Sequence, residues 1–159
     1  MNNQTITLRP LEKDDLDHFF IHQQDPEART MAAFVAEDPT NKEKFLAHWN
    51  RVLADSSITV RTILCNGRVS GHILCHSWFG NPELTYWIDK ADWGKGVATK
   101  SVELFLDEIA IRPIFARIVK DNVGSKRVLE KNGFIISGED KGFANGRQSE
   151  VEEFILTLS

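Results

Sequence analysis

The chain has 159 residues, of which 42% are apolar and 26% charged, and its formal net charge is −4. These values are typical of one globular domain, which we expect to span residues 1–159. The acidic balance argues against a protein that coats nucleic acid, because binding the phosphate backbone requires an excess of lysine and arginine. The N-terminus, Met1 to Thr5, is polar, and no apolar run approaches the roughly 20 residues of a membrane span. We therefore expect a soluble cytoplasmic protein, monomeric or homodimeric, without a nucleic-acid or membrane partner.

The first third of the chain predicts one strand and two helices. Alternation of apolar and polar residues over 6–9 indicates a short opening strand. Asp14 is expected to cap the helix that follows. Thr40 and Glu43 have the spacing of a capping box, which predicts the start of a second helix. Residues 24–40 between the two helices show no regular period.

An Asn-Gly pair at 66–67 gives the strongest hairpin signal, because alternating segments flank it at 58–64 and 69–75. With a two-residue turn, Cys65 pairs with Arg68 and Cys75 with Ile58. The cysteines then lie roughly 23 Å apart along the ribbon. A disulfide tolerates a Cα separation of only about 7 Å, so we expect both thiols to be free, as in a reducing cytosol.

The second half of the chain alternates strands and helices. The expected elements are strand 83–88, a helix after Gly96, strand 114–119, a short helix ended by Asn132-Gly133, and closing strands at 134–136 and 153–156. Residues 137–150, between the closing strands, are the least patterned. The order βααβββαβαββ indicates an α/β protein.

The glycine-rich segment from Trp93 to Thr99 places free backbone N–H groups at a helix start, where they and the helix dipole suit a phosphate. An ordinary turn before a helix is the alternative. Two nucleotide motifs match only in part. Gly94 to Ser101 reads G-x-x-x-x-T-K-S and lacks the second glycine of a P-loop, and Thr99 occupies the third glycine of the dinucleotide fingerprint.

The motifs of the second half, in this order, resemble those of the GNAT superfamily of acetyl-CoA-dependent N-acetyltransferases. The resembling residues are Asn122-x-x-Ser125-x-x-x-Leu129-x-x-x-Gly133-Phe134 after the glycine-rich turn, with Leu8-Arg9-Pro10 and Tyr86-Trp87-Ile88 before it. The opening and the Tyr-Trp-Ile strand are similar to the ribosomal-protein N-acetyltransferase branch. The resemblance implies a GNAT-like α/β fold with a mixed, mostly antiparallel sheet. Helices would flank this sheet, and it would be splayed between its fourth and fifth strands.

The resemblance also implies how acetyl-CoA is held, with no metal. The turn would cradle the pyrophosphate, backbone groups of the splayed strand would bond the pantetheine as a false strand does, and Asn122 would hydrogen-bond it. Asn122 could also cap the next helix, and the two roles need not exclude each other. Trp93 departs from the family's usual arginine or glutamine. The cofactor-binding set is Trp87, Ile88, Trp93, Gly94, Lys95, Gly96, Val97, Ala98, Thr99 and Asn122.

Two protons must move in the reaction implied. An amine at pH 7 is mostly ammonium and must lose a proton, and the departing thiol, with a pKa near ~8.5, benefits from a donor. Glu83 is the candidate base, directly or through water, and a solvated strand end is its alternative. Ser125 matches the hydroxyl that this branch carries near the sulfur, although it could be an ordinary helix-start serine.

Two histidines, His72 and His76, lie four positions apart, about 13 Å on a strand, and so cannot share a metal. His76 could line the cleft, but we expect it at the surface. The predicted function is acetyl transfer from acetyl-CoA to a primary amine of a small molecule or protein N-terminus by direct attack, without an acyl-enzyme. The alternatives are a non-catalytic acyl-CoA-binding regulatory domain and, more remotely, a P-loop nucleotide hydrolase. Residues 20–45 and 137–150 are expected to choose the acceptor, which the sequence leaves open.

Overall fold

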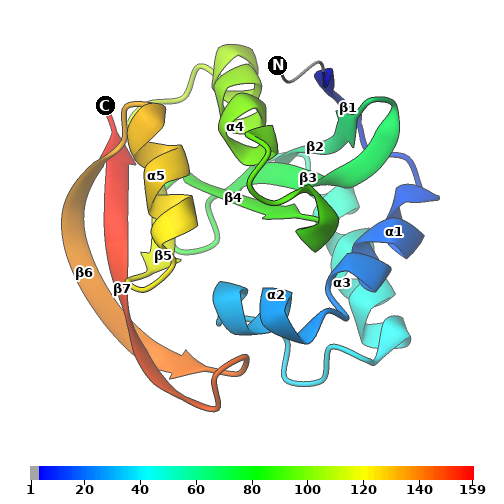
Figure 1. The fold of residues 1–159 in the computed structure, drawn as a ribbon, viewed down its shortest axis with the longest axis horizontal. Helices are drawn as coiled ribbons and strands as arrows, with labels where there is room; N and C mark the ends of the chain where they lie inside the picture. The colour runs from blue at the N-terminus through cyan, green and yellow to red at the C-terminus, as the bar shows by residue number, and fades with distance from the viewer. Residues whose placement is uncertain (1–3) are drawn as a thin grey trace.

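The computed structural model describes residues 4–159, so part of the polar N-terminus lies outside the described residues (Figure 1). The elements in chain order are β1 (Ile6–Pro10), α1 (Asp15–His22), α2 (Pro26–Ala32), α3 (Lys42–Ala54), β2 (Thr59–Cys65), β3 (Arg68–His76), β4 (Glu83–Ile88), η1 (Lys90–Asp92), α4 (Val97–Glu108), β5 (Ile114–Val119), α5 (Val123–Lys131), β6 (Ile135–Ala144) and β7 (Ser149–Leu158). None of the described helices is long and apolar enough to cross a membrane.

The seven strands form one mixed sheet in the order β1-β2-β3-β4-β5-β7-β6. Neighbouring strands are antiparallel except β4 and β5, which run parallel and share a single pair, Glu83 with Phe115. Beyond that pair the two strands are not joined, which confirms the predicted splay between the fourth and fifth strands. Figure 1 shows β1–β4 on one side of the molecule and β5–β7 on the other.

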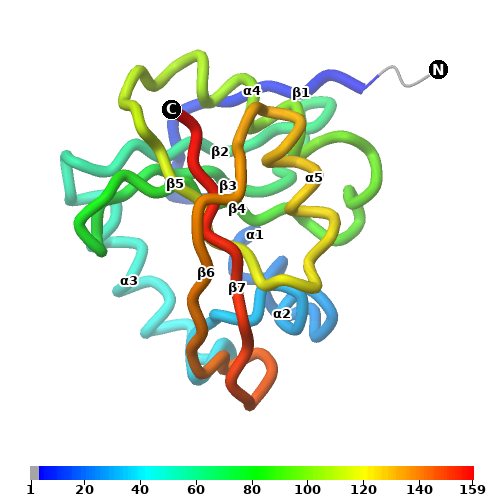
Figure 2. The backbone as a smooth tube through the Cα atoms, turned by 90° about the vertical axis from the view of Figure 1, so that its left-hand side faces the viewer, coloured from blue at the N-terminus to red at the C-terminus, as the bar shows by residue number. Residues whose placement is uncertain are grey.

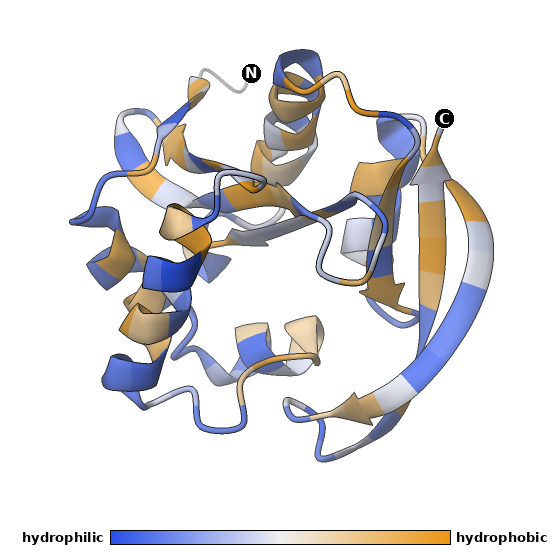
Figure 3. Cartoon of the chain, turned by 180° about the vertical axis from the view of Figure 1, so that it is seen from behind, coloured by the Kyte–Doolittle hydropathy of each residue, from blue (hydrophilic) through white to orange (hydrophobic). Residues whose placement is uncertain are grey.

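Helices cover both faces of the sheet. α4 and α5 bury Val102, Phe105 and Leu129 against Ile73 of β3 and its neighbours, which forms the larger apolar core. α1 and α3 pack a smaller apolar cluster against the opposite face. Its buried residues are Leu16, Phe19, Trp49, Val52 and Leu74. The edge strand β6 is mostly exposed, and much of it is hydrophilic in Figure 3.

Three local expectations need correction. Residues 26–32 form α2, where Pro26 occupies the first turn and the Asp25 side chain accepts from Ala28 N at 2.9 Å. Asp14 stands at the start of α1 without capping it. The cap of α3 is Asn41, not Thr40, and its side chain accepts from Lys44 N.

The closing strands are longer than predicted. The segment expected as a connection, 137–150, forms most of β6 and the start of β7. Figure 2 shows this curved hairpin reaching toward α2. Contacts fix its tip, because Gly146 N donates to Ala33 O at 2.8 Å and Arg147 pairs with Asp121 at 2.8 Å. The two segments expected to choose the acceptor are thus in contact.

The β2–β3 hairpin has the predicted turn, and Cys65 pairs with Arg68 as predicted. A register shift at Ile63/Leu64 then moves Cys75 opposite Thr59, so the predicted pairing with Ile58 is wrong by one residue. A bulge inserts one residue into one strand, which a pattern of alternating letters does not reveal. Both cysteines are free and buried.

Gly71 allows β3 and β4 to approach closely. A Cβ placed at Gly71 would stand 1.9 Å from the carbonyl oxygen of Trp87. We expect Gly71→Ala to force the strands apart and lower the free energy of unfolding by about 1–3 kcal/mol, measured by denaturant titration. Gly138→Ala is the matched control, because its nearest atoms are 3.7 Å away. Equal losses in both variants would contradict the steric explanation.

Candidate active site

The glycine-rich turn forms the entrance to α4, as the sequence predicts. Gly94 and Gly96 have φ values of 75° and 79°, and a Cβ added to either would meet no atom within 4 Å. Gly96 is the N-cap of α4 and no side chain caps this helix. The first N–H groups of a helix have no partner within it, so Val97, Ala98 and Thr99 present donors beside open space. An anionic group of the size of a phosphate fits this arrangement.

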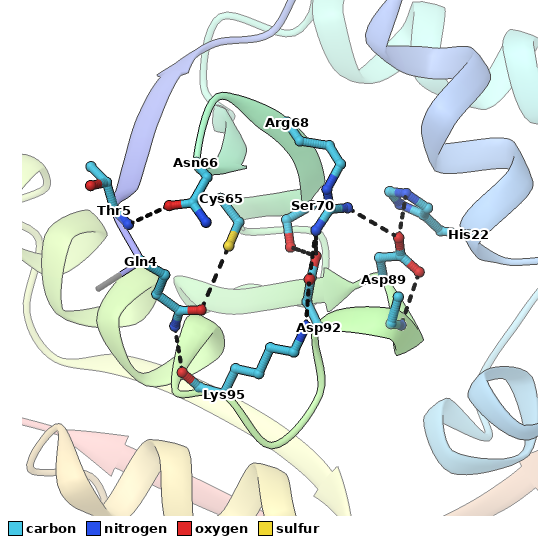
Figure 4. Close-up of polar contacts among 11 residues, drawn as sticks. Gln4, Thr5, His22, Cys65, Asn66, Arg68, Ser70, Asp89, Asp92 and Lys95 are labelled. Carbon is cyan, nitrogen blue, oxygen red and sulfur yellow. Dashed lines mark hydrogen bonds and ion pairs between the residues drawn. The ribbon is translucent and has the colours of Figure 1, made fainter. Parts of the chain in front are cut away.

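A buried carboxylate, that of Asp92, supports the glycine-rich turn. Asp92 accepts two hydrogen bonds from Arg68, at 2.6 and 2.8 Å, and one from Ser70 Oγ at 2.7 Å. Burial acts to raise the pKa of Asp92, but the bonds from Ser70 and Arg68 outweigh it and the pKa is lowered. Figure 4 shows Lys95 and Asp89 on either side of this group. No sequence pattern marks this support, because Arg68 and Ser70 lie at the start of β3 and Asp92 lies in η1, more than 20 positions later.

Trp93 ties the turn to the end of β4. Its indole Nε1 donates to Ile88 O at 3.0 Å, so the residue that departs from the family pattern has a structural partner. Ile88 O is one of the groups that the resemblance assigns to pantetheine, and a carbonyl oxygen has a second lone pair for another donor. The neighbouring indole of Trp87 is different, since its Nε1 is buried and has no hydrogen-bond partner among the described residues.

β4 carries Glu83, the candidate base, and Tyr86 on opposite faces. Successive side chains alternate along a strand, so Glu83 lies on the α1/α3 face and Tyr86 on the α4/α5 face. Tyr86 packs against the larger core, which confirms its orientation. The two residues stand where β4 and β5 separate, because Glu83 belongs to the single pair that the strands share.

Glu83 is buried, with 9% of its surface exposed, so the solvated strand end is wrong. Its carboxylate lies 3.7 Å from Nε2 of His76 and 3.5 Å from Nε of Arg117. Burial raises the pKa of Glu83; the positive charge of Arg117 opposes the rise and the nearby Glu153 adds to it. The expectation that His76 is a surface residue is also wrong, because only 2% of it is exposed.

Ser125 lies in the first turn of α5, where Asn122 Oδ1 accepts from its backbone N–H at 3.2 Å. The capping role of Asn122 is therefore real. Ser125 Oγ shares a hydrogen bond with Tyr86 Oη at 2.8 Å. Burial raises the pKa of Tyr86 to about 12, although the hydrogen bond with Ser125 acts to lower it. The phenol therefore stays protonated at neutral pH. No prediction from the sequence gives the Tyr86 hydroxyl a role, although strand alternation places Tyr86 on the same face as Ile88.

His72 is remote from these groups. Its ring lies 4.8 Å from both Phe19 and Trp49, and burial lowers its pKa to about 3. Within residues 4–159, no cluster of three or more His, Cys, Asp or Glu side chains could hold a metal ion.

Residues 5–135 match the acetyltransferase (GNAT) domain family. The chain belongs to this family. It is 28% identical over 170 residues to YdaF of Bacillus subtilis (strain 168), assigned as a ribosomal N-acetyltransferase, covering 97% of this chain and 92% of YdaF.

Solved structures share the fold. Mycobacterium smegmatis RimJ, in complex with CoA-disulfide, has a TM-score of 0.80 at 16% identity, covering 96% of this chain and 81% of RimJ. Spermidine N-acetyltransferase from Vibrio cholerae, in complex with CoA and spermine, has a TM-score of 0.72 at 22% identity, covering 96% and 95%.

Membership of the family confirms three predictions: the mixed α/β fold, the acetyltransferase class and the use of acetyl-CoA. The match to an acetyltransferase family also leaves the P-loop hydrolase without support. The comparisons give no support to the non-catalytic alternative. The family does not decide the acceptor or the roles of individual residues.

Proposed function

We propose that the chain acetylates a primary amine by direct attack of the amine on acetyl-CoA, at the point where β4 and β5 separate. One observation carries the proposal. A buried carboxylate, Glu83, lies on one face of β4, and a hydroxyl pair, Ser125 and Tyr86, lies on the other. The amine must lose a proton and the thiol must gain one, so Glu83 would serve as the base and the hydroxyl pair as the proton donor.

The turn before α4 would hold the pyrophosphate of acetyl-CoA. Backbone N–H groups of residues 94–98 supply donors, and the open space beside Gly94 and Gly96 lets an anion reach them. Backbone groups of Trp87 and Ile88 would bond the pantetheine amides, and the side-chain amide of Asn122 can donate from the other side. When bound, acetyl-CoA supplies the activated acetyl group.

Glu83 would take the proton from the amine, directly or through a water molecule. Its raised pKa brings the carboxylate closer to the working pH, which suits a general base. The cysteines offer no competing nucleophile, since both are buried and burial raises the pKa of Cys75. Direct attack therefore remains the route that these residues support.

Ser125 would donate to the departing thiolate, with Tyr86 holding its hydroxyl in place. We expect Ser125→Ala to lower kcat by at least about tenfold and to leave acetyl-CoA affinity nearly unchanged, because the donation belongs to the transition state. Steady-state kinetics and calorimetry measure the two effects. The loss should shrink with a more acidic leaving thiol. A fall of less than about threefold would remove Ser125 from the mechanism.

The acceptor would enter on the α1/α3 face. A cavity of about 310 Å³ lies between α2 and the β6–β7 turn and is lined by Arg29, Thr30, Asn145 and Gln148 among others. The cavity lies between the two segments, 20–45 and 137–150, that are expected to choose the acceptor. This position supports a role in selecting the acceptor, either a small-molecule amine or a protein N-terminus. The relative YdaF is named as a ribosomal N-acetyltransferase.

A turnover screen tests the proposal. Acetyl-CoA is incubated with the protein and a library of amino acids, polyamines, aminoglycosides and peptide N-termini, and thiol release is recorded. We expect release that depends on one class of amine, with the N-acetylated product found by mass spectrometry. Acetyl-CoA binding without turnover over the whole library would favour the non-catalytic domain instead.

We further propose that residues 1–159 act as one domain in the cytoplasm, as a monomer or homodimer, without a nucleic-acid or membrane partner. The free thiols and the net charge of −4 support this setting.

A further inference from the structure

His76 is buried beside Glu83, and three contacts hold its ring, two with Trp78 and one with Glu83. Its Nδ1 accepts a hydrogen bond from the backbone N–H of Trp78 at 3.2 Å. The indole of Trp78 stacks on the imidazole, with 3.8 Å between ring centroids and 17° between planes. Nε2 of His76 lies 3.7 Å from Glu83 Oε2. The loop after β3 therefore fixes both the position and the rotation of the ring.

These contacts decide which nitrogen carries the proton. In a neutral imidazole one nitrogen donates and the other accepts. Because Nδ1 accepts from the backbone of Trp78, the proton is on Nε2, which faces Glu83. Burial lowers the pKa of His76 to about 4, so the ring is neutral at pH 7. His76 consequently offers Glu83 a fixed N–H donor without a full positive charge.

Glu83 has a second donor beside it, because Nε of Arg117 lies 3.5 Å from Glu83 Oε1. Arg117 approaches from β5, but its NH1 also donates to Glu153 of β7 at 2.8 Å and to Asp140 of β6 at 2.9 Å. Its charge is shared among three carboxylates. Cys75, next to His76 along β3, points into the opposite core.

We propose that His76 is a positioning residue, whose Nε2–H holds the carboxylate of Glu83 toward the acceptor amine. The proposal rests on the proposed function, in which Glu83 is the base. The gap of 3.7 Å exceeds a hydrogen bond, and such bonds are often long before substrates bind and tighten in the complex. The ring does not relay the proton, because the lone pair of Nδ1 is engaged by Trp78 N–H.

The test is the pH dependence of kcat/KM for the amine. A donor to a carboxylate stabilises its charged form and lowers its pKa, so removing the donor raises that pKa. His76→Phe keeps an aromatic ring for Trp78 to stack on and removes both nitrogens. We expect the acidic limb to move to higher pH by at least about half a unit, and the rate on that limb to fall at least about threefold. The KM for acetyl-CoA should stay within about twofold.

Two further substitutions separate the contacts. Gln can place an amide N–H near the position of Nε2, so His76→Gln should restore the wild-type profile. Asn is too short to reach Glu83 but can accept from Trp78 N–H, so His76→Asn should behave like His76→Phe. If His76→Phe does not fold, the comparison of Gln with Asn decides the question. His48→Phe is the control, because His48 contacts Trp78 from α3, with centroids 6.0 Å apart, and should keep the wild-type profile.

An unmoved acidic limb in the folded His76→Phe and His76→Asn variants would overturn the proposal. So would equal behaviour of Gln and Asn. Glu83→Gln distinguishes failure of the positioning role of His76 from failure of the base role of Glu83. If Glu83→Gln removes the acidic limb while the His76 variants leave it in place, only the positioning role fails. If Glu83→Gln keeps the limb, the base is another group and the proposed function itself must be revised.

Discussion

Replacing Glu83 by glutamine is expected to lower kcat by about 10²–10⁴-fold, the range that a general base usually contributes. The amide keeps the shape of the side chain but cannot take a proton from the amine. Acetyl-CoA affinity should change little, since Glu83 lies on the face of β4 away from α4. Steady-state kinetics and calorimetry provide the two measurements.

The pH dependence of the same variant gives a sharper result. Burial raises the pKa of Glu83, so wild-type activity should rise with pH through this raised value as the carboxylate ionises. Glu83→Gln should lose that rise. Its deficit should shrink at high pH, where more of the acceptor arrives as free amine. A variant with the wild-type profile, or a kcat loss below about threefold, would exclude Glu83 as the base.

Gly96→Asp is expected to weaken acetyl-CoA binding at least tenfold, or about 1.4 kcal/mol, by calorimetry. Asp adds a side chain and a negative charge in the open space beside the N-terminus of α4, where the pyrophosphate would lie. Gly67→Asp is a matched control, because Gly67 has the same φ of 79° and open space but lies in the β2–β3 turn. Similar affinities in the two folded variants would place the phosphates elsewhere.

The sequence predicts the elements with a strong apolar period and misses those without one. α4 and the β2–β3 hairpin follow clear patterns and were predicted within a residue or two. α2 has only seven residues, too few to show a helical period. Most of β6 is exposed on both faces, so neither alternation nor a hydrophobic run marks it. The hairpin tip docked on α2 shows only in three dimensions.

The same distinction holds for the site. Residues 93–99 are contiguous, so their placement at the start of α4 could be predicted from the letters and the resemblance. Tyr86 and Ser125 lie 39 positions apart in the chain, so no local sequence pattern predicts their contact. The burial of His76 beside Glu83 also depends on tertiary structure. A polar residue on an alternating strand is expected at the surface, and the sequence does not show that the loop after β3 covers this histidine.

The central claim is that the acetyl group passes directly from acetyl-CoA to the amine while both are bound. Initial velocities measured over a grid of acetyl-CoA and acceptor concentrations test it most directly, once the screen has supplied the acceptor. We predict double-reciprocal lines that intersect, as a complex of enzyme with both substrates requires. Parallel lines would indicate a covalent acetyl-enzyme and would contradict the account.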